Sequence, residues 1–215
     1  WLVLGAEAIK FENKFPKSKQ FFAPNLNVLP VAKNISSKEK NSIKLFYLSR
    51  ISPVKNLLFA IEILKHISPH YKIEYSIYGN LEDNEYWKQC ETEISKLQKN
   101  ISVKYKGELP FHQIQSQLLN EQVLFLPTLN ENFGHSIVES LLCGCAAIIS
   151  NQTPWNDLEK NNVKVYFSNN EKNIIKFIEK SAECALIYKT TGTFTNLAKI
   201  YYKNIQLFLQ YNFFE

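Results

Sequence analysis

The 215-residue sequence predicts an α/β domain built on a parallel, doubly wound sheet. Two observations support this prediction. Strand-like apolar runs alternate with helical patterns from residue 43 to residue 166, as expected for parallel strands joined by right-handed crossover helices. Hydrophobic residues make up 45% of the chain, which is enough to bury a substantial core.

The expected elements follow one another in a regular order. The apolar runs predict strands over 43–49, 72–78, 101–105, 122–127, 145–150 and 163–166. The helical patterns predict helices over 55–67, 83–98, 110–119, 134–143 and 154–160, and then over 170–190 and 193–211. Because ligands bind at the carboxyl ends of the strands in such sheets, the residues just after each strand are the candidates for function.

The first candidate site follows strand 43–49. Arg50 is the only arginine among 25 basic residues, and Lys55 lies five positions later, where a helix is expected. A planar guanidinium binds carboxylate or phosphate in a bidentate way that lysine cannot reproduce. Both cations would therefore share one strand-to-helix turn at the ligand edge. For Arg50 alone, the alternative of an arginine without a function stays open.

The second candidate site follows strand 122–127. Glu131 lies in the loop before a helix that begins near Gly134, and Glu139 lies inside that helix. The backbone N–H groups of Gly134, His135 and Ser136 would face the gap between the two carboxylates, where the helix dipole favours an anion. Two alternatives stay open: Ser136 and Glu139 fit a capping box, and Glu131 fits a solvated loop acid.

Together the two sites resemble the donor-binding half of glycosyltransferase family 4, whose members are retaining enzymes of the GT-B fold. Residues 131–158, ENFGHSIVESLLCGCAAIISNQTPWNDL, are similar to one bacterial branch of that family nearly end to end. Gly79 and Gly107 fall where the family places its two donor-loop glycines. Ser49, Ala146 and Asn151 depart from the family pattern, but none of them removes a charged donor contact.

The resemblance implies a Rossmann-like sheet that forms the C-terminal half of a GT-B enzyme. Residues 31–190 would bind the nucleotide-sugar, and residues 191–215 would form a helix that packs back toward the N-terminal domain. Residues 1–30 would be a remnant of the N-terminal acceptor domain and of the link between domains. Because the sequence contains no methionine, we expect that its natural start is missing and that the chain is truncated. Without the acceptor domain, the chain would be inactive on its own.

The resemblance also assigns roles to single residues. It implies that Glu131, Arg50 and Lys55 are the catalytic group, with Glu131 on the transferred sugar and the two cations on the phosphates. It also implies a donor-binding group. Glu139 would hold the ribose, and the backbone amides of Gly134, His135 and Ser136 would hold the phosphates. Gly79 would let the backbone approach the nucleotide, and Leu109 would pack on the base.

The implied donor is a UDP-sugar or GDP-sugar, used without a cofactor or a metal, and the implied reaction is hexosyl transfer in polysaccharide biosynthesis. The acceptor would be a glycan or a lipid-linked saccharide, bound through the missing domain. The four cysteines form no CxxC pair, which is typical of reduced thiols in the cytoplasm, and the histidines show no metal-ligand spacing. The net charge of +5 is scattered, which argues against nucleic-acid binding. Peripheral attachment to the inner face of the membrane stays open.

Three other functions share some of these features. A dinucleotide-binding oxidoreductase would share the sheet, but the six glycines contain no GxGxxG pattern. A sugar-nucleotide epimerase would share the donor half. A non-catalytic module that binds nucleotide-sugar without transferring it also stays open.

Overall fold

The structure is a computed structural model that describes residues 39–155 and 170–183, and the backbone alone at 2–3, 21–22 and 165–167. The expected helix 193–211 lies outside the described residues, as does helix 154–160 apart from its first two residues. The expectations for segments 1–30 and 191–215 also fall largely or wholly outside them.

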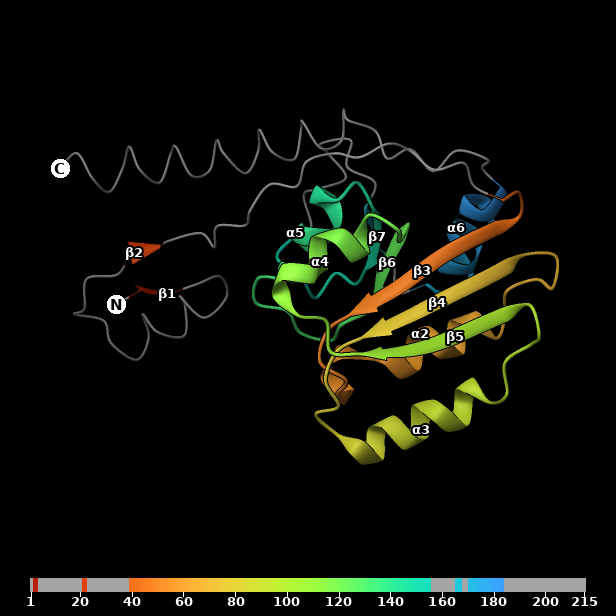
Figure 1. The fold of residues 1–215 in the computed structure, drawn as a ribbon, viewed down its shortest axis with the longest axis horizontal. Coiled ribbons are helices and arrows are strands. Elements are labelled where there is room, and N and C mark those ends of the chain that lie inside the picture. The colour runs from red at the N-terminus through yellow and green to blue at the C-terminus, as the bar shows by residue number, and fades with distance from the viewer. Residues whose placement is uncertain (1, 4–20, 23–38, 156–164, 168–169, 184–215) are drawn as a thin grey trace.

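A six-stranded parallel sheet forms the centre of the described region, in the order β5-β4-β3-β6-β7-β8 (Figure 1). Its strands are β3 (Ser42–Leu48), β4 (Lys72–Tyr78), β5 (Ile101–Gly107), β6 (Val123–Leu126), β7 (Ala146–Ile149) and β8 (Val165–Phe167). The predicted strand order along the chain and the predicted fold class are confirmed. Two short strands, β1 (Leu2–Val3) and β2 (Phe21–Phe22), pair separately.

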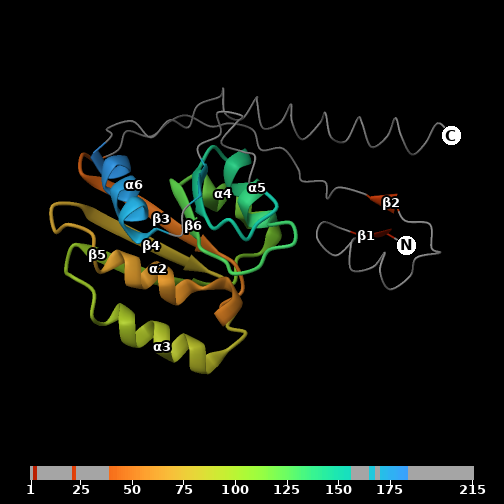
Figure 2. The same cartoon turned by 180° about the vertical axis from the view of Figure 1, so that it is seen from behind.

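Helices cover both faces of the sheet, as the doubly wound prediction requires. The first face carries α2 (Leu57–Leu64), α3 (Asn84–Ile94) and α6 (Glu171–Glu183), which are in front of the sheet in Figure 2. The other face carries α4 (Phe111–Leu118) and α5 (His135–Leu142). The chain winds outward from β3 in one direction and from β6 in the other, so the central pair β3 and β6 marks the switch point where ligands bind.

The burial of each strand follows its place in the sheet. Strands β6 and β7 are buried at every residue, as expected for strands with helices on both faces. The edge strand β5 is mostly exposed instead. Ser102, Lys104 and Lys106 lie on the face that α4 covers only in part, and Tyr105 is exposed as well. The loops at the carboxyl ends of β6 and β7 therefore start from fully buried strands.

One predicted boundary is wrong at the first candidate site. The helix expected over 55–67 is a 3-10 turn, η1 (Pro53–Lys55), followed by α2, which begins only at Leu57. Asn56 separates the two because it adopts the left-handed conformation, with φ 56° and ψ 38°. Asparagine tolerates this region better than most residues, and its side-chain amide donates to the Pro127 carbonyl at 3.1 Å. Lys55 therefore sits in a tight turn and not on a helix face.

Candidate active site

The loops that follow β3 and β6 are joined to each other by hydrogen bonds. The Leu129 N–H donates to the Val54 carbonyl at 2.8 Å, and the buried Thr128 hydroxyl lies 3.3 Å from the same carbonyl. With the Asn56 contact to Pro127, these bonds hold the two loops in one arrangement. The two loops that carry the predicted site residues therefore lie side by side.

Lys55 and Glu131 form the centre of this site. The Lys55 ammonium donates to Glu131 Oε2 at 2.7 Å and to the Asn130 carbonyl at 3.2 Å. Only 10% of the lysine side chain and 16% of the glutamate side chain are exposed. The alternative of a solvated loop acid at Glu131 is therefore wrong. Two opposite charges held this far from water depend on each other, because removal of one leaves the other without compensation.

Helix α5 begins beside this ion pair. Gly134 precedes it in the left-handed conformation, with φ 81° and ψ 60°, and the structure shows no side-chain cap. Ser136 lies inside the helix, so the capping-box alternative for Ser136 and Glu139 is wrong. A Cβ on Gly134 would approach Glu131 Cγ to 3.2 Å, which shows that the Glu131 side chain lies close to the helix start. The positive end of the helix dipole and the Lys55 ammonium therefore favour an anion on the same side of the sheet.

Glu139 differs from Glu131 in having no ion pair. Its carboxylate has no hydrogen-bond or salt-bridge partner among the described residues. Burial alone raises the pKa of Glu139 from 4.5 to about 7. A half-buried carboxylate without a partner loses hydration and gains no compensating bond in this state, and such groups are enriched in functional sites.

The Arg50 side chain contacts the loop that follows β4. Its guanidinium forms an ion pair with Glu82, and 58% of its side chain is exposed. The Glu82 loop is fixed there because the Glu82 N–H donates to the Ile51 carbonyl at 3.2 Å. The structure thus joins Lys55, Glu131 and the α5 start directly, and it holds Arg50 at the rim of the same edge.

Gly79 is required by the contact between neighbouring chain segments. It has a φ of 146°, and a Cβ there would lie 1.8 Å from the Ser49 carbonyl oxygen. Its N–H donates to the Gly107 carbonyl at 2.9 Å, which ties the ends of β4 and β5 together. Gly107 itself has a φ of 76° but open space where a Cβ would be. The role of Gly79 in approaching a nucleotide stays a prediction.

Two predicted site residues have mainly structural contacts in this state. Leu109 is partly buried against the hydrophobic core. The His135 residue is exposed, and its ring lies 4.8 Å from the ring of Phe133, between centroids. Their roles toward the base and the phosphates stay predictions.

Sequence reasoning missed the residues that support the site. Glu82, Asn56, Gln152 and Trp155 were not predicted to act there, yet each contacts a candidate residue or its loop. An asparagine after a Pro-x-Lys turn is a signal for a left-handed residue that could have been used. The contacts of Glu82 and Trp155 join loops that are distant in the sequence, so no local sequence pattern predicts them.

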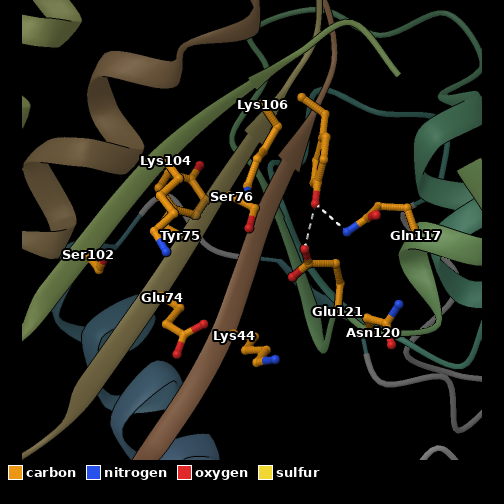
Figure 3. Close-up of a pocket in the computed structure, with 11 residues that line it drawn as sticks. Lys44, Glu74, Tyr75, Ser76, Ser102, Lys104, Lys106, Gln117, Asn120 and Glu121 are labelled. Atoms are coloured by element: carbon orange, nitrogen blue, oxygen red, sulfur yellow. Dashed lines mark hydrogen bonds between the residues drawn. The ribbon is translucent and has the colours of Figure 1, made fainter. Parts of the chain in front are cut away.

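A separate polar cavity of about 170 Å³ lies over the partly covered half of the sheet, between α4 and strands β3, β4 and β5 (Figure 3). At its side the Tyr78 hydroxyl donates to Glu121 Oε1 at 2.8 Å and accepts from Gln117 at 2.8 Å. Burial raises the pKa of Glu121, which is only 4% exposed. These bonds fasten α4 to the sheet and lie apart from the Lys55–Glu131 pair.

In the part of the chain that the structure describes, no three histidine, cysteine or acidic side chains are grouped as metal ligands. Within the same residues, no helix has the length and the apolar character needed to cross a membrane.

Comparisons with solved structures identify proteins with the same fold. A variant of S. aureus TarM, in complex with fondaparinux, alpha-GlcNAc-glycerol and UDP, is 16% identical with a TM-score of 0.66, and the match covers 96% of this chain and 43% of that one. Anabaena HepE in complex with UDP and glucose is 21% identical with a TM-score of 0.60, and the match covers 78% and 47%. This chain therefore spans less than half the length of either protein.

A third similar structure is a single domain. The C-terminal domain of LpcC, a glycosyl transferase group 1 family protein from Francisella tularensis, is 15% identical with a TM-score of 0.58, and the match covers 74% of this chain and 86% of that domain. No curated protein matches the sequence. The family model for glycosyl transferases group 1 matches residues 30–191. Since this match covers well over half of the sequence, the chain belongs to the glycosyl transferases group 1 family.

Proposed function

We propose that the chain is the nucleotide-sugar-binding domain of a retaining glycosyltransferase of family 4, and that it forms the C-terminal half of a GT-B enzyme. The observation that carries this proposal is the Lys55–Glu131 pair, held beside the start of α5 at the switch point of a parallel sheet. The UDP found in the TarM and HepE complexes supports a nucleoside diphosphate as the ligand of this site.

The proposed chemistry needs a site for phosphate charge. Sugar transfer breaks the bond between the anomeric carbon and the phosphate oxygen, so negative charge grows on the departing diphosphate. Lys55 and the N-terminus of α5 would hold that charge, and Arg50 would add a bidentate contact from the rim. These groups already supply positive charge, so we propose that the transfer uses neither a metal nor a cofactor.

The two glutamates would act on the two sugars of the donor. When the diphosphate forms an ion pair with Lys55, Glu131 loses its counter-ion. Its carboxylate can then accept hydrogen bonds from hydroxyls of the transferred sugar. Glu139, whose carboxylate has no partner within the part of the chain that the structure describes, would accept from the ribose hydroxyls. A carboxylate suits both tasks because its two oxygens accept several hydrogen bonds at once.

The remaining assignments follow from the same proposal. The amides of Gly134, His135 and Ser136 would contact the phosphates, the backbone at Gly79 would approach the nucleotide, and Leu109 would pack on the base. The donor would be a UDP-sugar or GDP-sugar, and a hexosyl group would pass to a glycan or lipid-linked acceptor held by an N-terminal domain. We place this activity in polysaccharide biosynthesis, in the cytoplasm or at the inner face of the membrane.

Calorimetric titration of the 215-residue chain tests the proposal. UDP and GDP are titrated in buffer with EDTA and again with Mg²⁺, and UMP and GMP serve as controls without the second phosphate. We expect one diphosphate to bind, with an affinity that the chelator leaves unchanged. Absence of binding by both diphosphates, or binding only with Mg²⁺, would contradict it. A transfer and donor-hydrolysis assay on the full-length enzyme then separates a transferase from an epimerase or a non-catalytic module.

Glu82 should compete with the diphosphate for Arg50. An exposed ion pair of this kind contributes about 0.2–1 kcal/mol, so Glu82→Gln should tighten UDP binding roughly twofold to fivefold at low salt.

Arg50→Lys should weaken UDP binding roughly tenfold, because lysine keeps the charge but loses the bidentate geometry. Titrations at two salt concentrations check both effects. Equal affinity of Arg50→Lys and the parent would show that the single arginine has no role in binding.

Glu139 should couple stability to pH. Its pKa is raised from 4.5 to about 7, so the folded state holds the proton more tightly than the unfolded chain between these values. The contribution of Glu139 to stability is therefore most favourable below pH 4.5, falls as the pH rises toward 7 and is constant above that. Glu139→Gln should raise the free energy of unfolding at pH 8 by about 1–2 kcal/mol after solvent screening is allowed for, and by only about a quarter of that at pH 5.

Thermal melts at both pH values measure this difference, and UDP titration of the same variant should show weaker binding. Glu85→Gln is the matched control, because that side chain is 79% exposed. A gain in stability at pH 8 that also appears in Glu85→Gln would refute the assignment to Glu139.

A further inference from the structure

The loop between β6 and α5 is held from one side by the segment that follows β7, residues 150–155. Three hydrogen bonds join them. The Ser150 hydroxyl donates to the Thr128 carbonyl, the Glu131 N–H donates to the Gln152 carbonyl at 3.1 Å, and the Trp155 indole N–H donates to the Phe133 carbonyl. The bonds are spread along the loop and end one residue before Gly134. They fix the backbone of Glu131 and the approach to helix α5.

Trp155 contacts the end of this loop in two ways. Besides its hydrogen bond to the Phe133 carbonyl, its ring packs edge-on against the Phe133 ring, with centroids 5.5 Å apart at 69°. The Phe133 ring also lies next to the His135 ring. The indole thus holds both the backbone and the side chain of the residue that leads into the helix.

The 150–155 segment is itself ordered by short-range bonds. The Gln152 N–H donates to the Ser150 hydroxyl oxygen at 3.2 Å, and the Thr153 hydroxyl donates to the Ser150 carbonyl at 3.4 Å. The Trp155 N–H lies 3.4 Å from the Thr153 hydroxyl oxygen. Ser150 and Thr153 are 6% and 4% exposed, so these turns are packed into the domain. A segment of this kind provides a fixed support for the loop it contacts.

We propose that Trp155 is a positioning residue of the donor site, which acts through Phe133 on the start of α5 and on Glu131. This inference rests on the proposed function, because the positioned groups are those assigned to the diphosphate and the sugar. Trp155 needs no contact with the ligand itself. Displacement of positioned groups by about 1 Å can lower activity by up to about 100-fold. Loss of one hydrogen bond at the helix start can therefore lower the affinity for the diphosphate.

Trp155→Phe separates the two contacts, because it keeps an aromatic ring and removes the indole N–H. We expect UDP affinity to fall about fivefold to tenfold while the melting temperature changes little. Trp87→Phe is the matched control: Trp87 packs on Tyr105 over the edge strand, with centroids 4.9 Å apart, so the same change there should leave UDP affinity unaltered.

Hydrogen exchange provides a second readout that requires no ligand. In Trp155→Phe, the backbone amides of 131–136 should exchange faster than in the parent, while those of β5 should be unchanged. Unchanged exchange over 131–136 overturns the proposal, and so does UDP affinity equal to that of a UDP-binding parent. If the parent binds neither UDP nor GDP, the proposed function fails, and the exchange rates still decide whether Trp155 positions the loop.

Discussion

Gly79→Ala is expected to destabilise the domain by about 4 kcal/mol, which lowers the melting temperature by roughly 10 °C for a domain of this size. The new Cβ would lie 1.8 Å from the Ser49 carbonyl oxygen, and backbone atoms cannot rotate away as a flexible side chain can. The φ of 146° adds strain for any residue with a side chain. Denaturant unfolding followed by circular dichroism measures the loss.

Gly107→Ala is the matched control for this prediction. Gly107 also has a positive φ, of 76°, but nothing lies within 4 Å of its missing Cβ. The backbone cost alone is about 1 kcal/mol. If the two variants lose equal stability, the close approach of Ser49 is relieved by a small shift of the chain and the steric argument is wrong.

Lys55→Gln should have the largest effect on ligand binding, a loss of UDP affinity of about 100-fold. The substitution removes a cation assigned to the phosphates, and it also leaves the Glu131 carboxylate as an uncompensated negative charge next to them. The same imbalance should cost about 2 kcal/mol of stability, less than for a fully buried pair because both side chains are partly exposed. Calorimetry and thermal melts measure the two effects.

Three further variants test whether Lys55 and Glu131 have separate roles. Lys65→Gln makes the same charge change in the Glu62 and Glu93 ion pairs of α2 and α3 and should leave UDP binding unchanged. Glu131→Gln should bind bare UDP at least as tightly as the parent, and its cost should appear only with UDP-sugar and in turnover. Combined with Lys55→Gln, it should recover part of the lost stability. Parent-like UDP affinity in Lys55→Gln would mean that Lys55 serves only to hold Glu131.

The fold was predictable because its signals are local. Each central strand is a short apolar run ended by a polar loop, and the pattern changes to a helical period after it, so strand order along the chain and fold class followed from residues 43–166. The start of α5 was placed within one residue, at His135. Lys55 and Glu131 were both predicted as site residues because they follow strands whose carboxyl ends meet at one edge.

The errors occur where tertiary contacts decide the local structure. Asn56 adopts a left-handed conformation that interrupts the expected helix, and its amide is held by a carbonyl from the distant Pro127. The Arg50 partner Glu82 lies in another loop, and its position depends on how that loop packs on Ile51. The close approach of Gly79 to the Ser49 carbonyl was not predicted either, because it joins the ends of two different strands, and the role of Gly79 toward a ligand stays a prediction.

The Lys55–Glu131 pair joins residues 76 positions apart, across the central strands β3 and β6. The segment between them, which includes β4, α3, β5 and α4, forms a long loop that must close before the two side chains can meet. Closing so long a segment carries an entropic cost that is recovered only when the last contacts form. We therefore expect the Lys55–Glu131 pair to form late in folding. A fragment that ends before β6 would carry Arg50 and Lys55 without Glu131 and without the start of α5.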